Sequence, residues 1–358
     1  MKQTLTDRLT DAAIAAFLWA FRIAVVLIVV VGSYLTLASG KYGAETWTGL
    51  VITGLTQGSI YALIALGYTM VYGILRMINF AHGEIFMAGS FGGYFAGLGL
   101  AATGFLNANP IASVISIAIM IVVAAAFATG LALLVERIAY RPLRNAPRLI
   151  PLISAIGASF FLQYTFRGWL GPGVYAYQSV TFLDELVPIS FVRLRWIDVL
   201  VVSSAIIMMT GLYLFVMRTK IGTAIRAVSE DKATAALMGI DVNRAIVTTF
   251  AVGAAMAGAA GVLYGLIFRQ INFYSGFEPG LKAFTAAVLG GIGNVPGAML
   301  GGLFLGQVEA LGPTLFLDGL NVPSPTSLAK TIGFTMLVLI LVFRPSGILG
   351  ERLSGQRA

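Results

Sequence analysis

Long apolar stretches recur along nearly the whole chain, and short loops between them hold most of the charges. A helix needs about 20 predominantly apolar residues to cross a bilayer, so each such stretch predicts a membrane-spanning helix. The segment 111–135 is the clearest, since it contains no ionisable residue. The others are 13–38, 49–75, 84–105, 150–169, 197–217, 245–267 and 327–343. The pattern therefore predicts an all-α polytopic membrane protein with about eight spanning helices.

The basic residues gather in a few loops and at the two ends of the chain. The segments 136–148, 218–244 and 344–358, together with Lys2 and Arg8, hold 14 of the 23 basic residues. Loops rich in Lys and Arg stay in the cytoplasm. We therefore expect a multi-pass membrane protein with both termini cytoplasmic.

A further apolar stretch at 283–309 differs from the rest because its middle reads GGIGNVPG at 290–297. Glycine and proline break a helix there. Three apolar stretches lie between two segments expected in the cytoplasm, so one of them must turn back. We expect a re-entrant pair of half-helices that meet near Asn294 at mid-membrane depth. Irregular backbone inside a membrane needs polar partners, which makes Gly291, Gly293 and Asn294 candidate pathway residues.

The composition fits one membrane domain and excludes several other classes. Hydrophobic residues make up 58% of the chain and charged residues only 11%, against about 25% charged in a soluble domain. The net charge of +8 then indicates contact with anionic membrane lipid, and no nucleic-acid partner is expected. Without cysteine and with one histidine, the chain offers no disulfide, and we expect no metal site and no cofactor.

An enzyme or a motor would need residues that the sequence does not provide. An intramembrane enzyme needs a paired nucleophile and base, and His82 is the only histidine. A phosphate-binding loop needs a glycine five residues before Gly-Lys and a hydroxyl residue after it. Around Gly40-Lys41 these positions are Leu35 and Tyr42. We therefore expect no ATP binding through that motif, so any energy from ATP must come from a partner.

The basic loop 218–244 predicts two short helices. Ile221, Ile225 and Val228 fall at helical spacing. After a polar break, a second helix is expected at 232–238, ending at Gly239. This cytosolic hairpin is either a solvated loop with one face on the bundle or a docking element for a soluble partner.

The segment 79–84 places an amide, an imidazole and a carboxylate at the start of an apolar helix. In one interpretation Asn79 caps the helix and Glu84 lies favourably at its positive end. In the other, Asn79, His82 and Glu84 belong to a transport pathway, as ionisable groups inside membranes often do. For Glu309 the same reasoning favours a position at the membrane interface over one in the pathway.

Small residues recur at every fourth position in two of the predicted helices, a pattern that allows close helix packing in lipid. These residues are Gly89, Gly93 and Gly97, and Gly253, Ala257, Gly261 and Gly265.

Several motifs resemble one family of membrane proteins. Within 218–244, Asp231, Ala235 and Gly239 stand as in the EAA-type loop through which ABC importer permeases meet their ATPases. Other blocks resemble the LivH-type permeases of branched-chain amino-acid ABC importers. These blocks are GSIYALIALGYTMVYG at 58–73, INFAHGE at 78–84, ERIAYRP at 136–142, KAFTAAVLGGIG at 282–293 and PSGILG at 345–350.

The resemblance covers roughly 47–350. It implies a transmembrane permease subunit of the prokaryotic plasma (inner) membrane that forms a translocation pathway for branched-chain or other hydrophobic amino acids. It also implies a transport subunit without its own ATPase site, whose ATP is bound by partner subunits. Its implied partners are two ATP-binding subunits, a second, similar permease subunit and an external solute-binding protein. The implied ATPase-coupling residues are Arg226, Glu230, Asp231, Ala235 and Gly239.

The extent of the resemblance divides the chain into three regions. Residues 1–46 form an N-terminal extension with one expected transmembrane helix, 47–350 the permease domain and 351–358 a cytoplasmic tail. The run 23–31 loosely imitates a signal peptide, but the acidic residues before it favour a retained helix. Permeases for urea or short amides remain an alternative, as does a secondary transporter, which would need charges at mid-helix.

Overall fold

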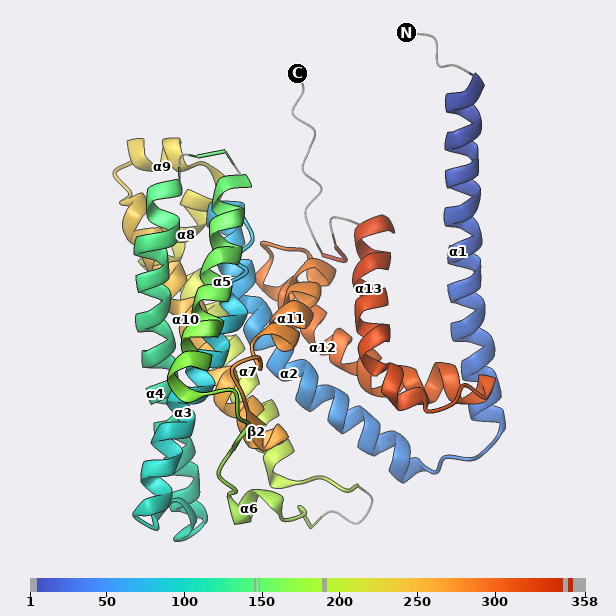
Figure 1. The fold of residues 1–358 in the computed structure, drawn as a ribbon, viewed down its shortest axis with the longest axis horizontal. Helices are drawn as coiled ribbons and strands as arrows, with labels where there is room; N and C mark the ends of the chain where they lie inside the picture. Colours follow the sequence, from blue (N-terminus) through green and yellow to red (C-terminus); the bar gives the residue numbers. More distant parts are fainter. Residues whose placement is uncertain (1–4, 145, 148, 189–191, 344–346, 350–358) are drawn as a thin grey trace.

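The computed structural model describes residues 5–144, 146–147, 149–188, 192–343 and 347–349, and nearly all of them lie in helices (Figure 1). Within these ranges, eight helices are long and apolar enough to cross a membrane. The prediction of an all-α polytopic membrane protein is therefore confirmed.

The elements follow one another in the order of the chain. The first half contains α1 (Leu5–Ala38), α2 (Ala44–Leu75), α3 (His82–Ala102), η1 (Phe105–Asn107), α4 (Pro110–Val135), η2 (Glu136–Tyr140), η3 (Arg141–Leu143) and α5 (Leu149–Leu170). The middle contains β1 (Tyr175–Ala176), α6 (Thr181–Asp184), α7 (Trp196–Arg218), α8 (Lys220–Glu230), α9 (Lys232–Leu237), α10 (Val242–Phe268) and β2 (Gln270–Ile271). The last part contains α11 (Phe277–Gly290), α12 (Val295–Gly312), η4 (Pro313–Leu317), η5 (Asp318–Leu320), η6 (Pro325–Leu328) and α13 (Ala329–Phe343).

Seven of the eight long helices match predicted segments, and the eighth differs. The prediction counted 327–343, where α13 has 15 residues within the part of the chain that the structure describes, which is interrupted after Phe343. The eighth long apolar segment is instead 295–320, because the helical backbone continues from α12 through η4 and η5. The α11–α12 break falls at 291–294, where Gly291 and Gly293 have positive φ. That this pair re-enters the membrane from one side stays a prediction.

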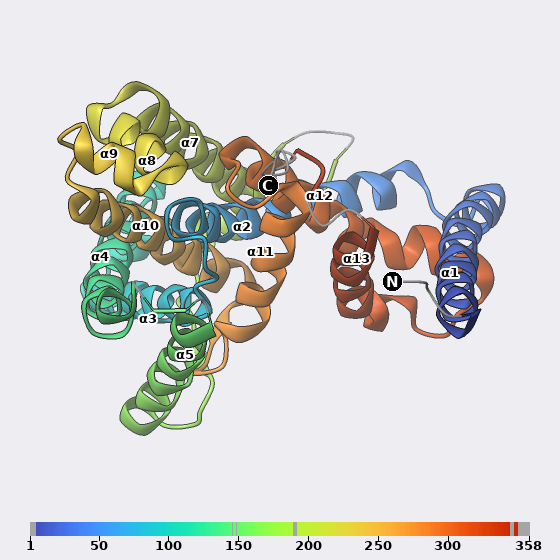
Figure 2. The same ribbon diagram turned by 90° about the horizontal axis from the view of Figure 1, so that it is seen from above.

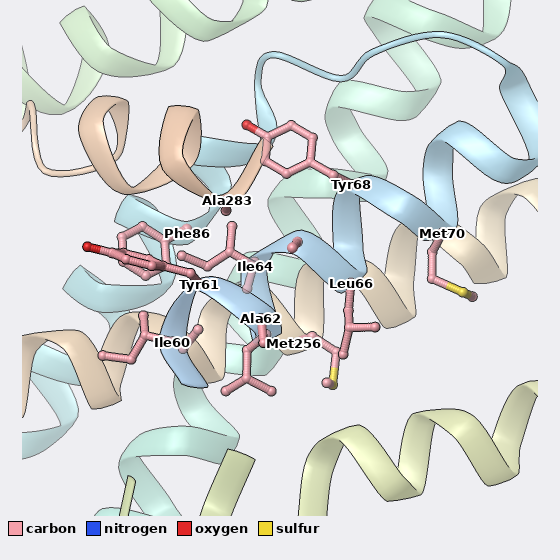
Figure 3. Packing of buried hydrophobic residues seen from close by; sticks show 14 of the residues in the cluster. Ile60, Tyr61, Ala62, Ile64, Leu66, Tyr68, Met70, Phe86, Met256 and Ala283 are labelled. Atoms are coloured by element: carbon pink, nitrogen blue, oxygen red, sulfur yellow. The ribbon is translucent and has the colours of Figure 1, made fainter. Parts of the chain in front are cut away.

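The middle of α2 forms the centre of the core. From Ser59 to Val71 every residue of this helix is buried, so it has no lipid-facing stripe. Figure 3 shows side chains of α2 on all sides of the helix, with Phe86 of α3, Met256 of α10 and Ala283 of α11 packed around it. A fully surrounded helix positions any polar group that it carries with little freedom.

Small residues bring several helices into backbone contact. A Cβ built on Gly89 of α3 would lie 2.4 Å from the Cα of Gly258 in α10. On α10, Gly261 meets the backbone of Ser90, and Gly265 meets the ring of Tyr177. The two predicted small-residue ladders are therefore packing surfaces between close helices, as expected in lipid.

The helix α1 stands apart from the main bundle (Figures 1 and 2). Its C-terminal half contacts η4 and η5, where a Cβ on Gly32 would collide with the carbonyl of Phe316. Thr36 Oγ1 accepts a hydrogen bond of 2.9 Å from the Gly319 backbone amide. The most apolar part of α1 contains no buried residue. Most of the surface of this helix is therefore exposed.

Candidate functional site

The hairpin of α8 and α9 lies at one end of the bundle (Figure 1), and each of its helices has a side-chain cap. Thr219 caps α8 by accepting a hydrogen bond of 2.9 Å from Gly222 N. Asp231 caps α9: its Oδ1 accepts hydrogen bonds from Ala233 N and Thr234 N at 2.8 and 3.1 Å. Both caps are formed by residues close in sequence, so the local sequence specifies the two helices.

One face of α8 fixes the hairpin to the bundle. Ile225 and Val228 are buried, and Gly222 packs so closely on the backbone of Val216 that a Cβ would lie 2.4 Å from its carbonyl oxygen. The Arg76 guanidinium, at the end of α2, donates a hydrogen bond of 3.0 Å to the Ser229 carbonyl. The hairpin is therefore held in a fixed position at the ends of α2 and α7.

The outer end of α9 exposes apolar side chains. Leu237 is 88% exposed and Met238 is 78% exposed, whereas Ala235 on the opposite face is buried. The helix ends at Gly239, whose φ of +82° suits glycine and whose Cβ position is open space. Two large apolar side chains beside an open turn form a surface that another protein can cover.

The remaining predicted coupling residues are also accessible. Arg226 and Glu230 are exposed. The Thr234 hydroxyl and the amides of Thr234 and Ala233 lower the pKa of the Asp231 carboxyl, because all three donate to its charged form. Asp231 therefore acts first as the cap that orders α9, and no observation of the structure tests a direct contact with an ATPase.

The three candidates at 79–84 lie inside the bundle, each beside a different partner. All are buried, and the Tyr140 hydroxyl donates a hydrogen bond of 2.6 Å to Asn79 Oδ1. The His82 ring packs edge-on against Tyr68, with ring centroids 4.8 Å apart. The Ser159 hydroxyl donates to Glu84 Oε1 at 3.4 Å, and Glu84 Oε2 has no hydrogen-bond partner among the described residues.

This arrangement differs from a helix cap. α3 begins at His82 without a side-chain cap, so the expectation that the Asn79 side chain caps the helix is wrong. Its amide is held by Tyr140 of η2 instead, a partner 61 residues away in sequence. Glu84 does lie in the first turn of α3. A role of these three side chains in a pathway stays a prediction.

The candidates at the α11–α12 break form a tight turn. Asn294 caps α12 by accepting a hydrogen bond of 2.9 Å from Gly297 N, and its Nδ2 donates to the Leu349 carbonyl at 3.0 Å. The Leu349 amide in turn donates to the Gly290 carbonyl at 3.1 Å. Backbone groups at the break are thus paired with the segment 347–349, and Gly291, Gly293 and Asn294 do not line the cavity described next.

A cavity of about 680 Å³ lies between α2, α10, α11, α12 and α13. Its wall includes Gln270 of β2, which follows the end of α10 opposite to α8 and α9. Apolar and aromatic side chains make up part of the wall: Leu50, Tyr264, Phe268, Pro279, Ala310 and Pro313. A pocket of this size with a few charged groups is typical of a small-molecule site.

Four charged side chains form a continuous series of ion pairs along this cavity. The Lys330 ammonium lies 2.7 Å from Glu278 Oε2, and the Lys282 ammonium lies 3.0 Å from Glu278 Oε1. Lys282 also forms an ion pair with Glu309. The Tyr61 hydroxyl donates a hydrogen bond of 2.8 Å to the other Glu309 oxygen. The order Lys330, Glu278, Lys282, Glu309 alternates in charge.

The sequence had placed Glu309 at the interface, whereas the structure buries its side chain in the wall of the cavity. Burial increases along this series of four charged side chains, from Lys330 with 65% side-chain exposure to Glu309 with 5%. The spacing of Glu278 and Lys282, four residues apart on one helix, was a signal that sequence reasoning did not use. The pairing of Lys282 with Glu309 has no local signal, because the α11–α12 turn brings the two together.

Comparison with known proteins identifies the family. A model of permease components of the branched-chain amino acid transport system matches residues 50–341. The chain belongs to this permease family. It is 44% identical over 311 residues to the high-affinity branched-chain amino acid transport permease BraD of Pseudomonas aeruginosa, covering 84% of this chain and 95% of that protein.

Two further relatives extend the comparison. The permease LivH of Escherichia coli K12 is 42% identical over 318 residues, covering 84% of this chain and 94% of LivH. A probable branched-chain amino acid permease LivM of Methanocaldococcus jannaschii is 31% identical over 149 residues, which is 39% of this chain and 43% of that protein. No solved structure matches the chain. The resemblance of the sequence to LivH-type permeases is thus confirmed, and with it the assignment to a family of multi-pass transport permeases.

Proposed function

We propose that this chain is the permease subunit of an ATP-driven importer for branched-chain or other hydrophobic amino acids. The names of BraD and LivH, which are branched-chain amino acid permeases at 44% and 42% identity, support the substrate class. In this proposal the permease itself binds no ATP, and its partners are two ATP-binding subunits, a second permease subunit and an external solute-binding protein. The similarity to LivM supports a second, related permease.

The observation that carries the coupling role is the end of α9. Its exposed Leu237 and Met238 lie beside Gly239 on a hairpin that is fixed to α2 and α7. A rigid projection transmits movement of a docked partner to the spanning helices, provided that the partner binds one state of the permease more tightly than the other. Two large exposed apolar side chains supply the contact area that such docking needs.

The orientation follows from the hairpin. If the ATP-binding subunits dock on α8 and α9, then this end of the bundle lies in the cytoplasm, and the proposal places both termini on that side as well. The cavity, at the opposite end of α10, then opens toward the external side, where a solute-binding protein delivers its ligand. The basic loops 136–148 and 218–244 support the same orientation.

Copurification tests the proposal directly. The complex is expressed with its ATP-binding subunits, and the permease is purified through a tag in detergent. The double substitution Leu237→Glu, Met238→Glu should remove most of the copurifying ATPase, because it places two carboxylates in the apolar contact. Val174→Glu is the matched control, since Val174 is also exposed but lies in the loop before β1. Equal ATPase recovery with both variants would contradict docking at α9.

A further inference from the structure

The cavity between α2, α11 and α13 holds equal numbers of positive and negative groups. Among the described residues that line it, the charged ones are Glu278, Lys282, Glu309 and Lys330. Two carboxylates and two ammonium groups cancel in formal charge. A neutral cavity with charges in a low-dielectric wall accepts a ligand of zero net charge more readily than an ion, because an added ion leaves an uncompensated charge.

The four charges differ in how strongly they are held. Glu309 and Lys282 are almost fully buried, and Tyr61 fixes both: its hydroxyl donates to Glu309 and accepts from the Lys282 ammonium at 3.3 Å. Lys330 is 65% exposed, and among the described residues that line the cavity it forms an ion pair with Glu278. The buried pair of Lys282 and Glu309 is therefore held in place. The contact between Lys330 and Glu278 is the one that can open.

That outer contact contributes little to the fold. Ion pairs between exposed or half-exposed side chains stabilise a fold only weakly, because water competes for both partners. Its place in the wall of the cavity, at the end of an alternating series, is therefore better explained by a ligand than by stability. The apolar wall from Leu50, Phe268 and Pro313 borders the same space.

We propose that the alternating series Lys330, Glu278, Lys282 and Glu309 is a binding site for a neutral zwitterionic amino acid. The ligand enters the contact between Lys330 and Glu278. Its carboxylate pairs with the Lys330 ammonium, its ammonium pairs with the Glu278 carboxylate, and the alternation of charge is preserved. The apolar side chain of the ligand lies against the apolar wall. The amino-acid class rests on the proposed function, and the site adds which groups select zero net charge.

Protection from alkylation tests this site without the solute-binding protein. The chain has no cysteine, so Ser327→Cys places a single thiol in the cavity wall. In the purified transporter complex, leucine at about ten times its dissociation constant should slow alkylation by N-ethylmaleimide about tenfold, since few sites remain free. Glutamate and arginine at the same concentration should not slow it.

Two charge-removing substitutions should change the selectivity in opposite directions. In the Ser327→Cys background, Glu278→Gln leaves the cavity with one excess positive charge, so glutamate should protect the thiol. Lys330→Gln leaves one excess negative charge, so arginine should protect it. Both substitutions should weaken protection by leucine at least tenfold in concentration, because each removes one of its two charged partners.

The pair Lys41 and Asp318 provides matched controls. It is an ion pair of 3.0 Å outside the cavity wall, and Lys41→Gln and Asp318→Asn should leave the protection pattern unchanged. Equal protection by leucine in Ser327→Cys alone and in Ser327→Cys with Glu278→Gln would overturn the site. Protection by glutamate or arginine in Ser327→Cys alone would also overturn it. Absence of protection by any amino acid would also overturn it, while copurification of the ATPase would still support the proposed function.

Discussion

Gly58 of α2 and Gly306 of α12 pack backbone to backbone: a Cβ built on Gly306 would lie 2.4 Å from the Cα of Gly58. This contact fixes the helix that carries Tyr61 against the helix that carries Glu309. The hydrogen bond between those two side chains therefore depends on glycine at both positions.

The first prediction concerns this contact. Gly306→Ala should destabilise the protein by roughly 1–3 kcal/mol, because the added methyl group forces two packed helices apart. The measurement is the midpoint of thermal unfolding in detergent. Gly130→Ala is the matched control, since a Cβ at Gly130 in α4 meets nothing within 4 Å. Equal midpoints for the two variants would show that the α2–α12 contact is not close in the folded protein.

The buried pair of Lys282 and Glu309 gives the second prediction. Lys282→Met leaves the Glu309 carboxylate buried with only Tyr61 as a partner, and loss of one member of a buried pair costs roughly 3–5 kcal/mol. The double substitution Lys282→Met, Glu309→Gln should restore much of this loss, because it removes the unpaired charge. Thermal unfolding of the three proteins measures both effects. A double variant less stable than the single one would be inconsistent with the pairing.

The cap of α9 gives the third prediction. Asp231→Ala should make the amides of α9 exchange with deuterium roughly three to ten times faster, since the cap that orders them is lost, whereas Asp231→Asn should retain most of the protection. The pKa of Asp231 is lowered, so the stability that its carboxylate contributes is fully present above the ordinary pKa of aspartate and is lost progressively as the pH falls from there through the lowered value. Protection corrected for intrinsic exchange should therefore be the same at pH 7 and at about pH 5, above the ordinary pKa of aspartate. A decline already between these two pH values would contradict the lowered pKa.

Sidedness is the fourth prediction. In this cysteine-free chain, a cysteine at Ser179 should react with a membrane-impermeant thiol reagent in intact cells, and one at Ala236 of α9 should react only after the cells are permeabilised. Both positions are exposed in the structure, so a difference reports the side of the membrane. Labelling at Ala236 with protection at Ser179 would invert the orientation.

Features encoded by neighbouring residues were predictable from the sequence. The hairpin of α8 and α9 was expected at nearly its observed bounds, because apolar spacing, the polar break before Lys232 and Gly239 all act within a few residues. The long spanning helices were expected for the same reason. The helix break at 290–297 was also clear from its glycines and proline, although its depth in a membrane was not.

Features that depend on distant partners were not predictable. A cap of α3 was one of the two interpretations of Asn79, but Tyr140, from another part of the chain, holds its amide. The ion pair of Lys282 and Glu309 forms only because α11 and α12 fold back on each other. The exposure of Leu237 was also missed, since an apolar residue in a helix is usually buried and its surroundings are set by tertiary structure.

The most direct test of the account is coupling in the complete transporter. The permease is reconstituted in liposomes with its ATP-binding subunits, its second permease and the solute-binding protein, and ATPase activity is measured with and without leucine. Gly239→Trp should abolish the leucine-dependent increase, because a large side chain then occupies the open space beside Leu237, while Gly239→Asn should retain it, since Asn tolerates the left-handed backbone. Loss with tryptophan and retention with asparagine is the predicted result, and full leucine-dependent ATPase activity with Gly239→Trp would contradict coupling through α9.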